Sequence, residues 1–351
     1  MNARGLRGVV AAMAALALTT LTAACGGSGG DSKAGAAPAE VRLGFFPNIT
    51  HATALVGVEK GLFAKHLGSG TTLKTSTFNA GPAAIEAVFS GAIDATYVGP
   101  NPAINAWSKS KGQAIKIVAG AASGGVFLVV KPGITSPEQL KGKKIATPQL
   151  GNTQDVALRY WLSEKGIKTD TKGGGDVHIV PQENSQTIQT FATGDIDGAW
   201  VPEPFASRLI KESGGKVLVD ERDLWPGKQF VITHLIVRQE FLKEHPDTVR
   251  KLIEAHVEAN ALIKSDPAGA AKTANAALEK LTGKPLKPEV LDSAFKNITF
   301  TDDPIASSLV GSAEHATKVG LLDPVDLNGI YDLKILNEVL AAKGESAISD
   351  K

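Results

Sequence analysis

Residues 41–65 read VRLGFFPNITHATALVGVEKGLFAK, and this stretch sets the class of fold. Val41 to Phe45 form a short, largely apolar run that predicts a β-strand, and His51 to Lys65 predict a helix after a brief turn. A strand followed directly by a helix is the unit from which parallel sheets are built. We therefore expect the folded part of the chain to begin near residue 40 with such a unit.

The same order of elements continues along the chain. A helical segment at Ile85–Phe89 precedes a strand-like run at Ile93–Val98. Further strands are predicted at 115–119, 127–130, 144–146, 177–180, 196–200 and 229–237, with helices near 153–164 and 185–193. Because strands alternate with helices, the sequence predicts an α/β fold with a mostly parallel sheet covered by helices.

The chain becomes rich in helical pattern from Pro246 onward. One face of the first helix in this part carries residues at spacings of three and four. These residues are Val249, Leu252, Ile253, His256, Val257 and Asn260. The pattern places His256 at the edge of a core, so we do not expect it to be a ligand-binding residue.

Length and charge bound the organisation and the partners. The part from about Glu40 to Lys351 holds roughly 310 residues, which favours two domains because one domain usually holds about 100 to 200. The whole chain has 37 Lys and Arg residues against 36 Asp and Glu residues. This balance gives no basis for binding nucleic acid. Any ligand is therefore expected to be held by a local site.

The first 24 residues have the layout of a bacterial export signal. Arg4 and Arg7 supply positive charge, residues 9–21 are mostly apolar, and Ala23 and Ala24 are the small residues that a signal peptidase requires. The apolar run is shorter than the roughly 20 residues of a membrane-spanning helix. We expect residues 1–24 to be removed as a signal peptide.

Cys25 is the only cysteine of the chain. The segment Thr22-Ala23-Ala24-Cys25 resembles the lipobox of bacterial lipoproteins, in which the cysteine sulfur is lipidated, although Thr22 replaces the usual aliphatic residue. Residues 25–39 contain the run GGSGG and predict a flexible linker. We expect lipid anchoring at Cys25 on the extracytoplasmic face of the cell membrane. A secreted protein with an unpaired thiol is the alternative.

Small and polar residues follow several predicted strands at the points where helices begin. The turns lie at 46–51, 79–82, 98–102 and 151–154. In open parallel sheets the ligand crevice lies at the carboxyl ends of the strands. Helix N-termini there offer unpaired N–H groups and a positive dipole end, which suit an anion. The same residue types also occur in ordinary capped turns.

Four segments together resemble a known family. They are GVEKGLF at 57–63, FSGAIDA at 89–95, KKIATP at 143–148 and GDIDGAW at 194–200. In order and spacing they are similar to segments of the substrate-binding lipoproteins of ATP-driven (ABC) importers for nitrate, taurine and aliphatic sulfonates. The resemblance covers nearly all of the chain after the linker.

The resemblance implies a two-lobed periplasmic-binding-protein type II fold, in which two Rossmann-like lobes are joined by two crossovers. Lobe 1 would comprise residues 40–126 plus 235–351, and lobe 2 residues 127–234. A small anion would bind in the cleft between the lobes, and lobe closure would present it to a membrane permease with its ATPase. The resemblance favours an aliphatic sulfonate or taurine as the ligand, with nitrate as the alternative, and a monomeric protein.

The family also implies a set of binding residues. The turn at 151–153 would direct N–H groups and a hydroxyl toward the anion, so Asn152 and Thr153 are expected donors. Candidates from lobe 1 are Asn48, His51, Gly99, Asn101 and Ser123. His51 can donate a hydrogen bond when neutral or carry charge beside an anion, but it could equally be a surface residue of a first helical turn.

The loop at 200–204 departs from the family. Sulfonate and taurine relatives often carry a tryptophan and an aspartate here, whereas this chain has Trp200 with Pro202 and Glu203. We expect Trp200 in the cleft. Glu203 would suit an ammonium group if it faces the cleft, or it would cap the helix that follows and say nothing about the ligand.

Enzyme functions find little support in the sequence. The seven histidines form no close pair with metal-ligand spacing, and the glycine clusters lack the Lys-Ser/Thr of a phosphate-binding loop. A thiamin-pyrimidine synthase has a similar fold, but its cysteine-rich iron motif is absent. A ligand-sensing lipoprotein without a transport role is the other alternative. We expect no metal, no cofactor and no catalytic residues.

Overall fold

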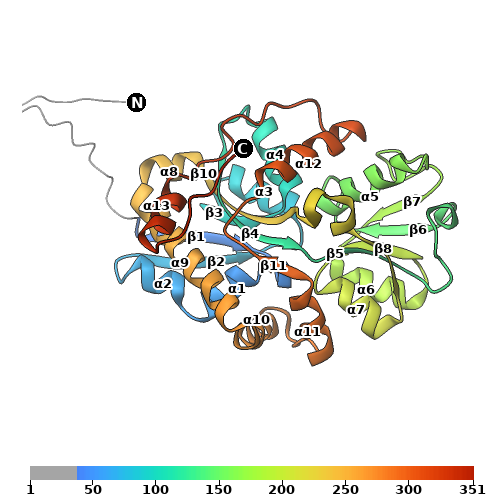
Figure 1. Cartoon of the computed structure of the whole chain (residues 1–351), viewed down its shortest axis with the longest axis horizontal. Helices are drawn as coiled ribbons and strands as arrows, with labels where there is room; N and C mark the ends of the chain where they lie inside the picture. Colours follow the sequence, from blue (N-terminus) through green and yellow to red (C-terminus); the bar gives the residue numbers. More distant parts are fainter. Residues whose placement is uncertain (1–37) are drawn as a thin grey trace, which may run out of the picture. The chain divides into compact units, whose positions relative to one another are not determined.

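The computed structural model describes residues 38–351 (Figure 1). The signal peptide predicted at 1–24 and the lipidation site Cys25 lie outside the described residues, as does most of the predicted linker at 25–39. Within the described part, no helix is both long enough and apolar enough to cross a membrane.

The strands and helices alternate through most of the chain, and helices dominate its last third. The strands are β1 (Glu40–Phe45), β2 (Thr72–Thr77), β3 (Ala95–Val98), β4 (Ile115–Gly124), β5 (Val126–Val130), β6 (Lys144–Thr147), β7 (His178–Pro181), β8 (Gly198–Pro202), β9 (Lys216–Asp220), β10 (Val231–Arg238) and β11 (Ile298–Phe300). The α-helices are α1 (Ala52–Glu59), α2 (Leu62–Leu67), α3 (Gly81–Phe89), α4 (Pro100–Lys109), α5 (Thr153–Glu164), α6 (Asn184–Thr193), α7 (Phe205–Ser213), α8 (Gln239–Glu244), α9 (Pro246–Ser265), α10 (Pro267–Thr282), α11 (Pro288–Lys296), α12 (Ala306–Lys318) and α13 (Lys334–Ala342). Short 3₁₀ turns are η1 (Ile49–His51), η2 (Pro137–Leu140), η3 (Glu221–Leu224) and η4 (Pro226–Lys228).

The strands form two sheets of the same design. The first has the order β11-β4-β10-β3-β1-β2 and the second the order β7-β6-β8-β5-β9. In the first sheet β1 pairs in parallel with β2 and β3, while β10 runs antiparallel between β3 and β4. In the second, β6 pairs in parallel with β7 and β8, while β5 runs antiparallel between β8 and β9. The second sheet therefore repeats the order β2-β1-β3-β10-β4 of the first.

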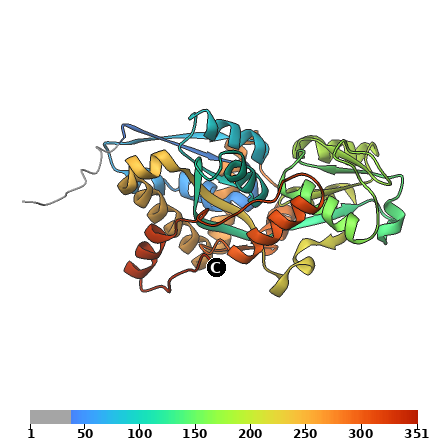
Figure 2. The same cartoon turned by 90° about the horizontal axis from the view of Figure 1, so that it is seen from above.

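The sheets are less parallel than the sequence pattern predicts. Each contains a central antiparallel strand, β10 or β5, because the chain enters that strand from the other sheet. It passes directly from β4 to β5 and returns from β9 to β10, which lies in the first sheet from Val231 onward. Figure 1 shows the second sheet with α5, α6 and α7, and Figure 2 shows the same green segments gathered on the right.

The single helix predicted at 51–65 is wrong, because the structure divides this segment into η1, α1 and α2. Gly61 interrupts it with a left-handed φ of 69°, a conformation that a helix interior cannot contain. The predicted helix at 153–164 and the strand at 41–45 are confirmed, the latter within one residue.

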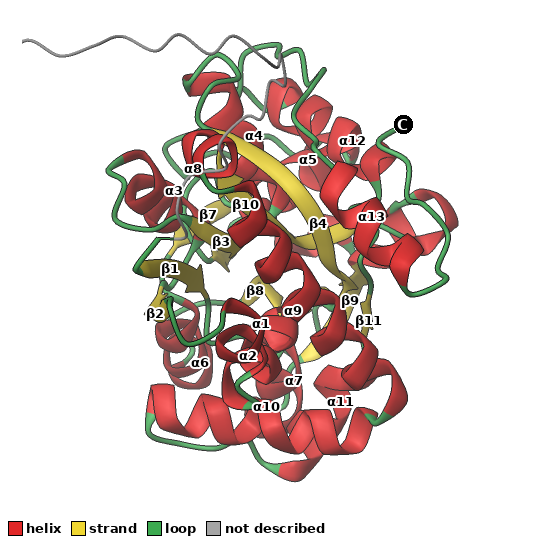
Figure 3. Ribbon diagram, turned by 90° about the vertical axis from the view of Figure 1, so that its left-hand side faces the viewer, coloured by secondary structure: helices red, strands yellow, loops and turns green. Residues whose placement is uncertain are grey.

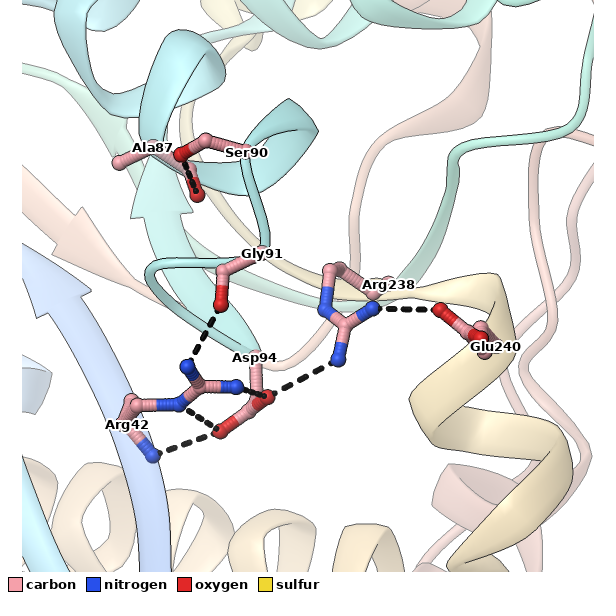
Figure 4. A network of polar contacts seen from close by, with 7 residues as sticks. All are labelled: Arg42, Ala87, Ser90, Gly91, Asp94, Arg238 and Glu240. Carbon is pink, nitrogen blue, oxygen red and sulfur yellow. Dashed lines mark hydrogen bonds and ion pairs between the residues drawn. The ribbon is translucent and has the colours of Figure 1, made fainter. Parts of the chain in front are cut away.

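The same kind of aspartate contact occurs once in each sheet and links neighbouring strands. Asp94 accepts hydrogen bonds from the backbone N–H of Arg42 (2.9 Å) and from its guanidinium, and Arg238 contacts the same carboxylate (Figure 4). Asp197 accepts the backbone N–H of Lys144 at 2.9 Å in the second sheet. Both aspartates precede β3 and β8, so they lie where these strands begin. The aspartates of the motifs FSGAIDA and GDIDGAW are thus structural, and they lie where β3 and β8 begin.

The helix-rich tail packs against the first sheet. Helix α9 lies among α1, α2 and α13 (Figure 3), and its predicted stripe is buried. His256 is fully buried, not at the core edge, and its Nδ1 lies 2.8 Å from the Tyr97 hydroxyl. Its Nε2 lies 3.3 Å from a carboxylate oxygen of Asp302. This buried polar network explains how a histidine can occupy a core position.

Candidate functional site

A small cavity of about 20 Å³ lies where the carboxyl ends of strands from both sheets meet. This volume holds about one water-sized molecule. Its lining residues are Phe46, Asn48, Thr50, His51, Asn79, Ala80, Gly99, Asn152, Thr153, Gln154, Asn184, Pro202 and Ile232. The lining contains no acidic residue, no lysine and no arginine, so polar recognition there depends on neutral groups.

Four helix N-termini reach this cavity. Ala80, Gly99 and Asn152 are the N-cap residues of α3, α4 and α5, and Asn184 is the first residue of α6. None of these helices has a side-chain hydrogen bond at its N-cap. Because the first N–H groups of a helix lack partners within it, the four helices can offer donors and positive dipole ends to one anion.

The start of α5 contributes the most distinctive donor. The Thr153 side chain is only 5% exposed, and its hydroxyl has no hydrogen-bond partner within the described residues. The buried carboxylate of Asp155 accepts hydrogen bonds from the Gly151 N–H (3.0 Å) and from Arg159 Nε (3.0 Å), which fixes the turn. An unpartnered buried hydroxyl carries a desolvation cost, so its presence at a cavity points to a ligand.

His51 is held as a neutral donor. Its Nδ1 accepts the backbone N–H of Phe46 at 3.2 Å, and its ring stacks on Phe46 with centroids 4.4 Å apart. Burial lowers the pKa of His51 to about 3, so the ring is neutral at pH 7. With Nδ1 accepting, the proton lies on Nε2, which can donate to a ligand.

A larger groove of about 510 Å³ adjoins the cavity and shares Asn48, Asn79 and Asn184 with it. The groove also contacts α7, α10 and α11, through apolar side chains such as Phe205 and Leu281. At its junction with the cavity, Asn79 Nδ2 donates a hydrogen bond to Glu183 Oε1 at 2.8 Å. Space for a bulkier group therefore lies directly beside the cavity.

Comparison with known proteins gives a consistent result. The model of the NMT1-like family matches residues 34–278. The chain belongs to the NMT1-like family. It is 30% identical over 230 residues to a binding protein of Brucella abortus (strain 2308), covering 65% of this chain and 68% of that one. It is 31% identical over 209 residues to the taurine-binding periplasmic protein of Escherichia coli (strain K12), covering 59% and 61%.

The fold of this NMT1-like protein is shared with a protein of known structure. The periplasmic nitrate-binding protein NrtA of Synechocystis PCC 6803 superimposes with a TM-score of 0.75 at 16% identity, covering 87% of this chain and 89% of that one. The periplasmic-binding-protein fold expected from the four sequence motifs is thereby confirmed, as is the resemblance to this family.

The structure brings five of the predicted residues of this NMT1-like protein together at the cavity. They are Asn48, His51, Gly99, Asn152 and Thr153. Asn101 and Ser123 do not line it. Asn101 donates its amide to the Ser312 carbonyl at 3.1 Å, and the Ser123 hydroxyl accepts the Phe230 N–H at 3.4 Å. These two side chains have structural partners instead.

The expectation that Trp200 lies in the cleft is wrong. Its side chain is completely buried, and its indole N–H donates to Glu221 Oε2 at 2.7 Å, which satisfies the donor inside the core. Burial raises the pKa of Glu221 to about 7 although this hydrogen bond acts against the rise. The loop reaches the cavity two residues later, through Pro202.

Glu203 adopts the capping role. Its carboxylate accepts the Ser207 N–H at 3.0 Å and the Ser207 hydroxyl at 2.8 Å, in the first turn of α7. Asn297 Nδ2 also donates to it at 2.7 Å. Burial raises the pKa of Glu203 against these hydrogen bonds. The side chain does not line the cavity, so it carries no information about an ammonium group there.

Sequence reasoning missed several lining residues. Asn79, Ala80 and Gln154 belong to turns that the sequence marks, but they were not singled out. Asn184 follows β7, the strand that corresponds to β2 in the repeated sheet order. Because the two sheets have equivalent strand orders, the turn after β7 corresponds to the turn after β2. This correspondence is the signal that could have pointed to Asn184.

No group of three or more histidine, cysteine or acidic side chains is placed to hold a metal ion among residues 38–351.

Proposed function

We propose that this NMT1-like protein is the extracytoplasmic solute-binding component of an ABC importer, and that it captures a small anion in the cavity. The observation that carries the proposal is the convergence of four helix N-termini without side-chain caps on a cavity that also contains the unpartnered Thr153 hydroxyl. The similarity to a taurine-binding periplasmic protein supports it. The protein would act by binding and release, without catalysis.

The anion would be held by neutral donors. Thr153 would donate its hydroxyl, His51 its Nε2–H, and the starts of α3 to α5 their backbone N–H groups. Such a site stabilises negative charge without a side-chain cation. Because the lining comes from both sheets, a bound anion would draw the two lobes together, and the closed form would be recognised by the permease and its ATPase.

An aliphatic sulfonate or taurine is the first candidate ligand. The adjoining groove of about 510 Å³ would take the organic part while the sulfonate occupies the helix N-termini. Nitrate is the second candidate, because a three-oxygen inorganic anion needs less space beyond this water-sized cavity than an organic sulfonate does. The fold likeness to a nitrate-binding protein is compatible with either ligand.

We propose in addition that the mature protein is a monomer anchored by lipid at Cys25, outside the described residues. The lipobox-like segment and the glycine-rich residues that follow it support this placement. We also propose that the sheets correspond to two lobes, with the chain crossing between them at β4–β5 and at β9–β10. These crossings would serve as hinges, since hinges need only absorb a few dihedral changes.

The proposal is tested by thermal unfolding of the mature protein with taurine, several alkanesulfonates, nitrate and a thiamin pyrimidine. A ligand at about a thousand times its dissociation constant stabilises the native state by about 4 kcal/mol, which raises the melting temperature measurably. Stabilisation by sulfonates or nitrate supports the anion-binding function and identifies the ligand class. Stabilisation by the pyrimidine alone, or by none of the compounds, contradicts it.

A further inference from the structure

Two hydrogen-bond acceptors lie next to each other in sequence where the cavity meets the groove. Glu183 is the N-cap residue of α6 and lines the groove, and Asn184 lines both spaces. Asn184 is 5% exposed, yet its Oδ1 has no hydrogen-bond partner among the described residues. The carboxylate of Glu183 does not cap its own helix. It accepts a hydrogen bond from Asn79, which follows β2 of the first sheet.

Glu183 differs from the other acidic residue of the groove. Glu212 is neutralised, because Arg208 Nε lies 3.0 Å and Lys287 Nζ 3.5 Å from its carboxylate oxygens. Glu183 has no ion pair within residues 38–351. Its carboxylate accepts a hydrogen bond from the neutral side-chain amide of Asn79. The groove also contains Lys284, for which the described residues show no ion pair. The groove beside the cavity therefore contains a carboxylate without a cationic partner, while the cavity itself is lined by hydrogen-bond donors.

This arrangement gives the binding space two chemically different ends. Thr153, at the start of α5, and His51 offer hydrogen-bond donors, whereas Glu183 and Asn184, at the start of α6, offer side-chain acceptors toward the groove. Glu183 is exposed, so water screens its charge, but its carboxylate still disfavours a bare anion placed beside it. The same carboxylate attracts a ligand that carries a positive group on its far side.

We infer that Glu183 is a specificity-determining residue that selects zwitterionic ligands, receiving the ammonium group of a small amino-anion whose negative group is held at the helix N-termini. This inference rests on the proposed anion-binding function and deepens it. Asn184 Oδ1 accepts a second hydrogen bond from the same ammonium group. Glu183, which lines the groove beside the cavity, thus takes the ammonium-binding role that was one of two alternatives for Glu203.

The inference is tested with two ligands of nearly equal shape. Taurine and 1-propanesulfonate differ in having an ammonium or a methyl group at the end of the chain. Isothermal titration calorimetry measures both dissociation constants for the wild type and for Glu183→Gln. We expect Glu183→Gln to weaken taurine binding by about twofold to fivefold and to leave 1-propanesulfonate binding unchanged or tighter. An equal change for both ligands overturns the inference.

Two further variants separate charge from packing. Glu212→Gln removes a carboxylate that is already neutralised, so the ratio of the two dissociation constants should stay at its wild-type value. Glu183→Gln removes the charge but keeps an oxygen that can accept from Asn79, whereas Asn79→Ala removes this hydrogen bond and keeps the charge, so the preference for taurine should persist in Asn79→Ala. If Asn79→Ala abolishes the preference as fully as Glu183→Gln does, the contact and not the charge determines it, and the inference is wrong.

The wild-type result separates this inference from the proposed function. Binding of 1-propanesulfonate or nitrate without binding of taurine leaves the anion-binding function intact and overturns the role of Glu183. If none of these anions binds, the proposed function itself fails, and the inference fails with it.

Discussion

Thr153 is a buried donor whose hydroxyl has no partner in the described protein, and this leads to a two-part prediction. Thr153→Ala should weaken anion binding by about 1 to 3 kcal/mol, because a buried anion loses one hydrogen bond. It should not lower the melting temperature of the ligand-free protein, because the hydroxyl stabilises nothing there. Calorimetry and thermal unfolding measure the two effects.

Thr153→Ser is the matched control, since it keeps the hydroxyl and should retain most of the affinity. Loss of ligand-free stability in Thr153→Ala, with affinity unchanged, would mean that the residue serves packing and not binding.

Glu221 gives the protein a pH-dependent stability. Burial raises the pKa of Glu221 to about 7 from an ordinary value near 4.5. Because the pKa is raised on folding, its contribution is fully present below pH 4.5 and is lost as the pH rises through about 7. The loss is on the order of 3 kcal/mol, since one pKa unit corresponds to about 1.4 kcal/mol. Urea unfolding between pH 4.5 and 8 should show it.

Glu221→Gln removes the titrating group but keeps an acceptor for the Trp200 indole. The free energy of unfolding of the wild type, relative to Glu221→Gln, should therefore fall as the pH rises across this range. A difference between the two proteins that is independent of pH would contradict the raised pKa.

The sequence predicted part of the site because strand ends in an α/β fold are marked by polar and small residues. Asn48, Gly99 and Thr153 lie in such turns and reach the cavity. The turn alone cannot say which way a side chain points, so Asn101 and Trp200 were misplaced. Asn101 turns to the Ser312 carbonyl and Trp200 to Glu221, and both partners lie more than 20 residues away in sequence. Such pairings are set by tertiary packing.

Most strands could be predicted because their apolar residues form short runs with the pattern of a strand, whereas the helices after α9 were foreseen only as a helix-rich segment. The three strands missed are β2, β9 and β11. β2 is an edge strand of mostly exposed residues, TLKTST, so it has no apolar pattern to detect. β11 has only three residues. The pattern of apolar residues does not give the direction of a strand. The antiparallel pairing of β5 with β8 and of β10 with β3 could therefore not be predicted.

The repeated aspartate contacts make a prediction about β1 and β6. Asp94 is buried and is bound by two arginines, whereas the Asp197 side chain is 32% exposed. Asp94→Asn should therefore lower the free energy of unfolding by about 1 to 3 kcal/mol. Asp197→Asn should cost less, because solvent screens its charge. Urea unfolding of both variants gives the comparison.

Anion affinity should be unchanged in both aspartate variants, since the contacts lie where the strands begin and the cavity lies where they end. A fall in affinity equal to that of Thr153→Ala would mean that the two strand ends are coupled, and the assignment of a purely structural role to Asp94 would be wrong.

Lipid anchoring is a prediction for the mature protein that the sequence alone supports. Cys25→Ser removes the only thiol to which a lipid can be attached. The variant should move from the membrane fraction to the soluble extracytoplasmic fraction, while the ligand affinity of the folded part stays the same. Cell fractionation followed by detection of the protein measures this. Retention in the membrane fraction would contradict the lipoprotein assignment.

Gly99, the N-cap residue of α4, closely approaches Thr153 of α5, and the two residues follow strands of different sheets. A Cβ on residue 99 would lie 2.6 Å from the Thr153 hydroxyl and 3.4 Å from the Ile232 carbonyl oxygen. Gly99 has an ordinary φ of −72°, so alanine brings no backbone strain of its own. Gly99→Ala should hold the two helix starts apart and weaken anion binding at least tenfold, as measured by calorimetry.

A double-mutant cycle tests whether the Gly99→Ala effect passes through Thr153. If the added methyl group acts by displacing the Thr153 hydroxyl, Gly99→Ala should cost much less affinity in a Thr153→Ala background. Small-angle scattering of the ligand-saturated proteins should give a larger radius of gyration for Gly99→Ala than for the wild type. Equal losses of affinity in both backgrounds would instead mean that the added methyl group contacts the Ile232 carbonyl of β10. The Gly99→Ala effect would then come from a clash with backbone and not from displacement of the Thr153 hydroxyl.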